Sequence, residues 1–174
     1  MSKRICDKAE CLPSKSVIDI YSVSDCLSKP FCPYRKHRHH NGYDLFNSIV
    51  NIQEVAELEG ADCTECTLFY YEVHDREFDE RSQAWRPFQP ERGFKTAVQC
   101  PSSKTLQGFD LVSIVGGYSF GCSPLSCNSL SASVPVNTHC LLGSCEEAIS
   151  LVERGLLVNC DPGPYRIYAV YRCE

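Results

Sequence analysis

The chain has 174 residues and a formal net charge of -5 at pH 7, and its 43% hydrophobic and 22% charged residues are typical of a globular protein. That length is enough for one domain with a sizeable hydrophobic core. The ten Gly and ten Pro exclude a collagen-like chain, and no apolar run approaches the roughly 20 residues of a membrane-spanning helix.

Cysteine is unusually frequent, with 13 occurrences. The N-terminal stretch MSKRICDKAECLPSKS is basic but lacks the apolar segment of a secretory signal. We therefore expect a cytoplasmic protein, in which disulfides are rare and cysteines serve as core residues, metal ligands or nucleophiles. The odd number of cysteines also argues against a complete disulfide framework.

Charge is unevenly distributed along the chain. Residues 1–40 contain eight Lys and Arg against four Asp and Glu, whereas residues 54–91 contain eleven Asp and Glu against three Arg. An acidic stretch repels nucleic-acid phosphates, so the main domain is expected to bind a basic protein partner and not a nucleic acid or a membrane. The carboxylates expected to contact that partner are Glu72, Asp75, Glu77, Asp79 and Glu80.

The N-terminal quarter of the chain lacks a clear periodicity. Residues 1–40 predict an irregular, partly ordered extension that is rich in Cys and His, and residues 41–174 predict a single domain. The domain is expected to begin with a short strand over residues 43–46. Residues 47–59 then place apolar side chains at helical spacing and are followed by Gly60, which predicts an amphipathic helix.

The middle of the chain predicts strands. Residues 67–73 are aromatic and β-branched, residues 94–99 are a second candidate, and residues 109–115 are the strongest. Residues 74–86 are charged and predict a loop or hairpin connection. The small and polar residues 120–128 predict a loop.

The C-terminal part predicts a helix and a closing strand. Ser144 and Glu147 form a capping box ahead of a helix that ends near Arg154, with Gly155 after it. Residues 165–171 alternate as a strand, with Arg166 expected on its solvent face. The irregular order of strands and helices predicts an α+β fold, with a mainly antiparallel sheet and two helices packed against it.

Four cysteines in the C-terminal half have the spacing C-x4-C-x12-C-x4-C. Four thiolates can form a tetrahedral structural zinc site. This candidate metal site consists of Cys122, Cys127, Cys140 and Cys145. Alternative ligand sets, with a less recognisable spacing, are the Cys26, Cys32, His37 and His39 group and the Cys63–Cys66 pair.

The loop before the second helix could instead hold a catalytic site. Cys127 is a candidate nucleophile, His139 its base, and Asn128 a residue that orients the imidazole or binds an oxyanion. Glu146 and Glu147 are candidates to hold His139. No P-loop, dinucleotide-binding or zinc-protease motif is present in the sequence.

Size, charge asymmetry and the absence of a catalytic signature favour a small intracellular binding or regulatory protein that engages a basic protein partner through an acidic surface. The alternatives are a Cys/His-dependent enzyme and a structural zinc-binding module.

Overall fold

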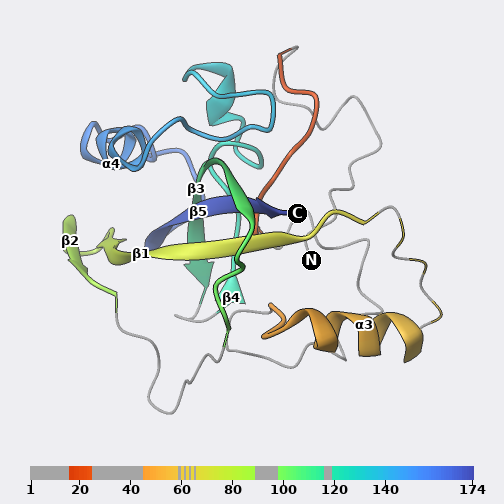
Figure 1. Cartoon of the computed structure of the whole chain (residues 1–174). Helices are drawn as coiled ribbons and strands as arrows, with labels where there is room; N and C mark the ends of the chain where they lie inside the picture. Colours follow the sequence, from red (N-terminus) through yellow and green to blue (C-terminus); the bar gives the residue numbers. More distant parts are fainter. Residues whose placement is uncertain are drawn as a thin grey trace.

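The computed structural model describes residues 16–24, 45–58, 60, 62, 64, 66–88, 98–115 and 119–174 (Figure 1). The helices are α3 (Ile49–Leu58) and α4 (Cys145–Glu153), with a short 3-10 turn at Leu130–Ala132. The strands are β1 (Phe69–Asp79), β2 (Ala84–Pro87), β3 (Lys104–Val115), β4 (Ser119–Phe120) and β5 (Tyr165–Cys173). No helix among these described residues is long and apolar enough to cross a membrane.

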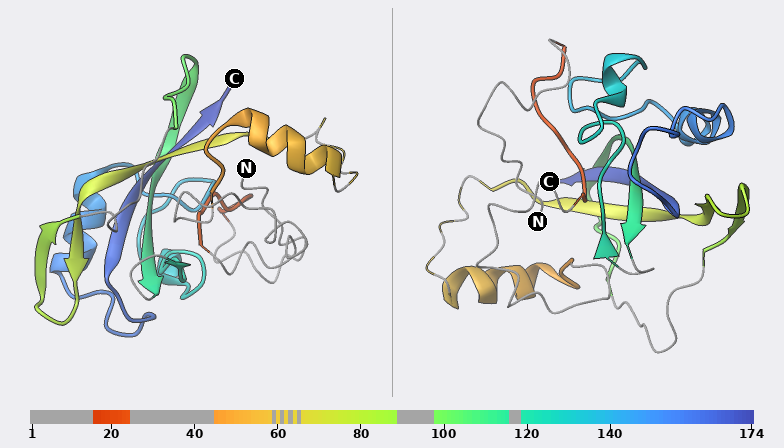
Figure 2. Two further views of the ribbon diagram at one scale, coloured as in Figure 1. Left: turned by 90° about the horizontal axis from the view of Figure 1, so that it is seen from below. Right: turned by 180° about the vertical axis from the view of Figure 1, so that it is seen from behind.

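The strands form one sheet in the order β2-β1-β5-β3-β4, and each neighbouring pair is antiparallel. The last strand in the sequence, β5, therefore lies at the centre of the sheet. The helices lie beside opposite ends of β5, with α4 near its start and α3 near its end (Figure 2). The predicted α+β fold with a mainly antiparallel sheet is confirmed.

The strand predicted over residues 67–73 is longer in the structure, because its second half pairs with both neighbours. Glu77 and Phe78 pair with β5 along one edge of β1 and with β2 along the other. The register of the β1–β5 pair shifts between Val73 and Glu77. Leu45 and Phe46 are not part of a strand, and residues 43–44 lie outside the described part of the chain. The predicted strand at 94–99 is likewise described only at its last two residues, which are not in a strand.

Helix α4 begins at the predicted N-cap residue Ser144, with one of the two hydrogen bonds of a capping box. Ser144 Oγ accepts a hydrogen bond from the Glu147 amide at 3.2 Å, and the Glu147 carboxylate accepts one from the Gly143 amide at 2.8 Å. Gly155 has a φ of 70°, which ends the helix in the left-handed conformation. The buried face of α4 packs against strand residues such as Leu111 and Ile167 in the largest core cluster.

Replacing Ser144 with alanine is expected to lower the free energy of unfolding by about 1 kcal/mol, because the Glu147 amide loses its acceptor. Urea unfolding measures this change. The control is S150A, because Ser150 is exposed in the same helix, and it should stay within about 0.5 kcal/mol of wild type. Equal effects of the two variants would contradict a capping role for Ser144.

Part of the predicted extension packs onto the sheet. Val17, Ile20 and Val23 are buried. The Ile18 amide donates to the carbonyl of Thr138 at 2.9 Å, and the Ser22 hydroxyl bonds to the buried carboxylate of Asp110. Residues 1–15 and 25–44 lie outside the described residues, so the boundary at residue 40 stays a prediction.

A buried ion pair joins the neighbouring strands β1 and β5. The Glu77 carboxylate accepts hydrogen bonds from Arg166 at 2.8 Å and from Arg86 on β2 at 2.9 Å. The Arg166 guanidinium also lies 4.1 Å from the centroid of the Phe88 ring. The prediction that Arg166 faces solvent is therefore wrong, because both faces of the sheet are covered at this point.

Candidate functional site

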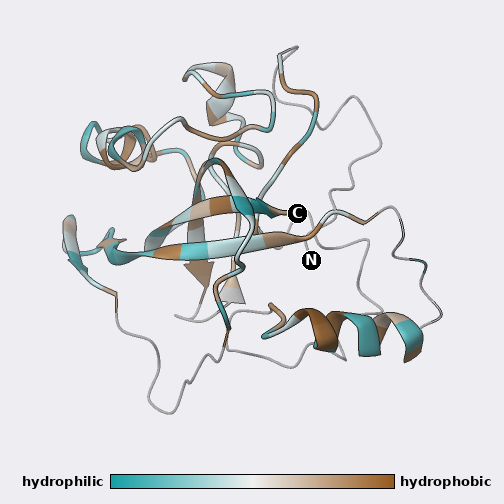
Figure 3. Ribbon diagram, viewed as in Figure 1, coloured by the Kyte–Doolittle hydropathy of each residue, from teal (hydrophilic) through white to brown (hydrophobic). Residues whose placement is uncertain are grey.

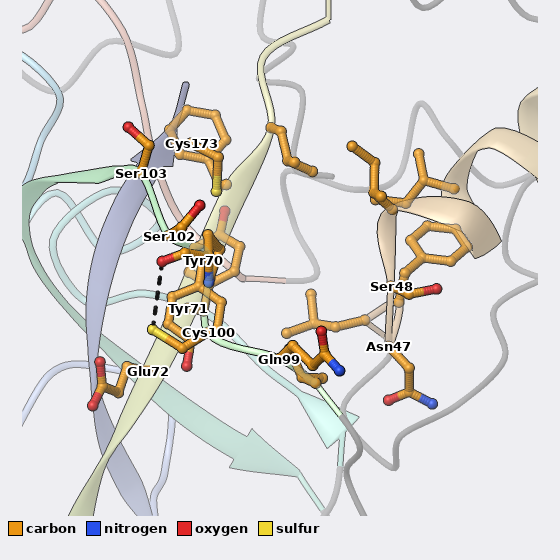
Figure 4. A pocket seen from close by; sticks show the side chains of 18 of the residues that line it. Asn47, Ser48, Tyr70, Tyr71, Glu72, Gln99, Cys100, Ser102, Ser103 and Cys173 are labelled. Carbon is orange, nitrogen blue, oxygen red and sulfur yellow. Dashed lines mark hydrogen bonds between the residues drawn. The ribbon is translucent and has the colours of Figure 1, made fainter.

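A groove of about 1000 Å³ lies between the start of α3 and one end of the sheet. Figure 4 shows Asn47 and Ser48 on one side of it and Tyr70, Glu72 and Cys100 on the other. Its described lining is made of residues 45–49, 52, 68–73, 98–103, 168, 173 and 174. The volume is within the range of small-molecule and peptide sites, which run to roughly 1,000 Å³.

The strand wall of the groove is aromatic. Tyr70 is paired with Tyr171 across β1 and β5, and their rings lie 6.0 Å apart. The Tyr71 side chain points to the opposite face of the sheet from Tyr70, because successive residues of a strand alternate. It packs with Leu45 against the core cluster that contains the buried Tyr168. The run of aromatic residues in β1 thus supplies side chains to both faces of the sheet beside the groove.

Helix α3, which supplies Ile49 and Ile52 to the groove, leaves apolar surface uncovered. Within α3, Val55 is buried, whereas Ile49, Val50 and Leu58 are 54%, 54% and 73% exposed. Figure 3 shows that hydrophobic and hydrophilic residues are both present along α3. The Asn47 side-chain oxygen is buried and has no hydrogen-bond partner among the described residues, so this end of the groove also has an unused acceptor.

The charged residues among the described lining are Glu72 and Glu174. Glu174 is held in place by the hydroxyls of Ser103 and Thr105, at 2.8 and 3.3 Å. The charged residues of α3 are also carboxylates, Glu54 and Glu57, and both are exposed. The groove and its helix therefore carry four carboxylates.

One lysine lies at the edge of this acidic groove. The Lys104 ammonium lies 4.4 Å from the centroid of the Tyr70 ring, 4.0 Å from that of Tyr171, and 3.5 Å from the Glu72 carboxylate. A hydrogen bond to the Cys100 sulfur is the main cause that raises the pKa of Lys104. Lys104 is therefore a fixed positive charge that offsets part of the negative charge of Glu72.

The five carboxylates predicted to contact a partner have different environments. Glu72 and Asp75 are exposed, with side-chain exposures of 54% and 86%. Asp79 bonds to Arg86 at 2.9 Å, and Glu80 accepts a hydrogen bond from the Gly163 amide at 2.8 Å. Glu77 is buried in the ion pair described above, so its carboxylate does not face a partner.

The three predicted catalytic residues are not brought together. The Cys127 thiol donates to Ser24 Oγ at 3.8 Å, and the Asn128 amide donates to Asp161 at 3.2 Å. The His139 ring stacks on Tyr21 with centroids 4.1 Å apart, and its buried Nδ1 has no hydrogen-bond partner within the described part of the chain. The Glu147 carboxylate bonds to the Gly143 amide. The arrangement thus supplies no nucleophile–base contact between Cys127 and His139.

The four cysteines of the predicted zinc site do not converge either. The described residues contain no group of three or more His, Cys, Asp or Glu side chains placed to hold a metal ion. Cys140 is buried in the core, and this burial raises its pKa to about 11. Burial and the neighbouring Glu146 raise the pKa of Cys145. Cys122 and Cys127 are partly buried, and the predicted zinc site stays a prediction without support from the described residues.

The alternative ligand sets cannot be placed. Cys26, Cys32, His37 and His39 lie outside the described residues, as does Cys63 of the Cys63–Cys66 pair.

Comparison with known proteins gives no relative: no protein-family model, curated protein or solved structure matches the chain. The function must therefore be argued from the chemistry of the groove. Sequence reasoning missed this groove because its walls come from segments that are far apart in the sequence. The one local signal was the pair Tyr70 and Tyr71, which cannot both be buried on one face of a strand.

Proposed function

We propose that the protein is a small intracellular binding protein, and that the groove beside α3 receives a basic segment of a protein partner. The observation that carries this proposal is the composition of the groove. Its walls combine aromatic and aliphatic side chains with uncharged polar ones, and the charged residues of its described lining are the carboxylates Glu72 and Glu174. Apolar anchors with complementary charge at the rim are the usual features of a peptide-binding surface.

The occupant that fits is a segment with both apolar and cationic side chains. Ile49 offers exposed apolar surface on the helix side of the groove, and Ile52 lines the groove beside it. The Tyr70 ring already holds one cation, the ammonium of Lys104, and tyrosine faces attract Lys and Arg side chains in general. Glu54 and Glu57 extend the negative charge along α3 beyond the groove. The described residues offer no comparable support for the two alternatives, since they show neither a Cys127–His139 contact nor a group of metal ligands.

The test uses a fluorescently labelled 12-residue peptide of alternating Lys and Leu as the probe, with a Glu and Leu peptide as its counterpart. Fluorescence anisotropy with the full chain should show binding of the Lys/Leu peptide that weakens as salt is raised, and no binding of the Glu/Leu peptide. Equal binding of the two peptides, or no binding of either, would overturn the proposal.

Removing the groove carboxylates should weaken this binding. The E72Q/E174Q double variant is expected to raise the Kd for the Lys/Leu peptide by about 3- to 10-fold, because each partly exposed contact contributes up to about 1 kcal/mol. The control is E153Q, because Glu153 is exposed at the end of α4 and changes the net charge without touching the groove. An equal effect of E153Q would mean that only the overall charge matters.

The contribution of the apolar wall is tested by a matched pair of variants. I49S removes an exposed side chain from the groove, and V158S removes one from elsewhere, where Val158 is 80% exposed. I49S is expected to weaken peptide binding by about 3-fold or more, in line with the loss of apolar contact area, and V158S should leave the Kd unchanged. If V158S weakens binding as much as I49S, the peptide does not sit in the groove.

A further inference from the structure

Residues 16–24, here called the strap, contain no helix or strand and form the red trace in Figure 1. Val17 and Ile20 belong to the largest core cluster, and Val23 belongs to a second one. The strap backbone bonds to a single loop, with the amides of Ile18, Asp19 and Tyr21 donating to the carbonyls of Thr138 and His139. The strap is therefore held by three buried apolar side chains and by the backbone of one loop.

The polar contact below the strap is made by Asp110 on β3. The Ser22 hydroxyl of the strap donates to one oxygen of this carboxylate, and the hydroxyl of Ser123, on the loop after β4, donates to the other at 2.7 Å. Ser22 and Asp110 are 3% and 1% exposed. No ion pair within the described part of the chain includes Asp110. The strap thus covers a carboxylate that has hydroxyl partners and no cation.

Covering this carboxylate affects its two charge states differently. Burial removes water from the ionised form, which costs free energy when no cation takes its place. This burial raises the pKa of Asp110 to about 6, although the hydrogen bonds from Ser22 and Ser123 act in the opposite direction. Release of the strap would let water reach the carboxylate again. The strap is therefore expected to bind the sheet more tightly over protonated Asp110 than over ionised Asp110.

The elements around Asp110 carry other titratable or charged groups, namely Asp19 and Tyr21 on the strap, Tyr168 and Arg172 on β5, and Cys127, His139 and Cys140 on the loops. The ordinary pKa values of Asp, Tyr, Cys and Arg lie outside the range from pH 5 to 7.5, whereas that of His lies inside it. A charge on His139 at acidic pH would weaken the strap contact, because its ring stacks on Tyr21 and its buried Nδ1 has no hydrogen-bond partner among the described residues. His139 and Asp110 thus predict opposite directions of pH dependence.

We propose that the strap is a pH-sensitive device that stays on the sheet at mildly acidic pH and is released more often as the pH rises, with Asp110 as the sensing group. Release uncovers the side of Phe69 on which Tyr21 packs, where the two ring centroids are 4.5 Å apart. Phe69 also lines the groove, so release changes the surface at one end of the groove. This behaviour does not depend on the proposed protein partner.

Hydrogen exchange of the full chain at pH 5 and pH 7.5, corrected for the intrinsic pH dependence of amide exchange, tests the proposal. The protection of the strap amides should fall by about tenfold between these pH values. At pH 7.5 the strap should also exchange faster than the amides of β5, because it leaves while the sheet stays folded. Strap protection that is constant or rises with pH, or that equals the protection of β5 at both pH values, would overturn the proposal.

Variants of the contact identify the sensing group. D110N keeps a neutral side chain at all pH values, so its strap protection should change by less than about twofold. S22A removes the hydroxyl that stabilises the ionised carboxylate and should lower strap protection more at pH 7.5 than at pH 5. The control I18T changes a strap side chain that is 67% exposed and should keep the tenfold fall. A tenfold fall that persists in D110N, or an S22A effect that is equal at both pH values, would contradict the role of Asp110.

Discussion

Replacing Glu77 with alanine is expected to lower the free energy of unfolding by about 3–5 kcal/mol, because it leaves Arg166 as a buried charge without its carboxylate. The side chains of Glu77 and Arg166 are 8% and 4% exposed. Arg86 bonds to the same carboxylate and would keep its second partner, Asp79. Chemical denaturation at pH 7 measures the change.

Two further variants separate the ion pair from a general effect on β1. D75N lies two residues away, where the side chain is 86% exposed, and should change the free energy of unfolding by less than about 0.5 kcal/mol. The double replacement E77L/R166L removes both charges and should be less destabilising than E77A alone, because no buried charge remains unpaired. If the loss of unfolding free energy in E77L/R166L equals the sum of the losses in the two single variants, this account is contradicted.

The second large effect concerns the buried carboxylate of Asp110. It accepts hydrogen bonds from Ser123 at 2.7 Å and from the Leu111 amide at 2.9 Å, and a third from Ser22. These bonds favour the ionised form, but burial outweighs them and raises the pKa of Asp110 to about 6. Asp110 therefore connects β3 to the described N-terminal segment and to the loop that follows β4.

The raised pKa makes stability depend on pH in a defined direction. Below pH 3.8, the ordinary pKa of Asp, the carboxyl is protonated in both the folded and the unfolded chain. Between pH 3.8 and about 6 the folded chain keeps the proton and the unfolded chain loses it. The stabilisation by the protonated form is thus complete below the unfolded pKa and is lost as pH rises through about 6.

The measurement compares wild type with D110N by urea unfolding from pH 4 to pH 7. The free energy of unfolding of wild type relative to D110N should fall by about 2 kcal/mol over this range, which is most of the roughly 3 kcal/mol that a pKa difference of about two represents. A carbon-13 NMR titration of the Asp110 carboxyl in wild type gives the same pKa without a variant. A difference that is constant with pH, or an Asp110 that titrates near 4, would contradict the prediction.

The sequence was sufficient for elements with a strong local signal. The capping box at Ser144 and the Gly155 stop predicted α4, and alternation predicted β5, because these signals depend on neighbours within one turn or one pleat. The same alternation misplaced Arg166. A period of two separates the faces of a strand, but it does not show that chain segments distant in sequence cover both of them.

The candidate sites depended on contacts that no local pattern encodes. Cys122, Cys127, Cys140 and Cys145 have a regular spacing, but tertiary packing places Cys140 in the core. Cys127 and His139 were paired only by residue type. The acidic stretch was predicted as one surface, yet Glu77 and Asp79 pair with nearby arginines. A charge count along the sequence cannot distinguish a carboxylate that faces solvent from one that bonds within the fold.

The central claim is that a basic segment binds in the groove beside α3, and hydrogen exchange of the full chain with and without the Lys/Leu peptide tests it most directly. At saturating peptide, amides in residues 45–52 and 68–73 should exchange more slowly, because both walls of the groove are covered. The amides of α4 should be unchanged. Slower exchange confined to α4, or no change at either wall with the peptide bound, would contradict the proposed site.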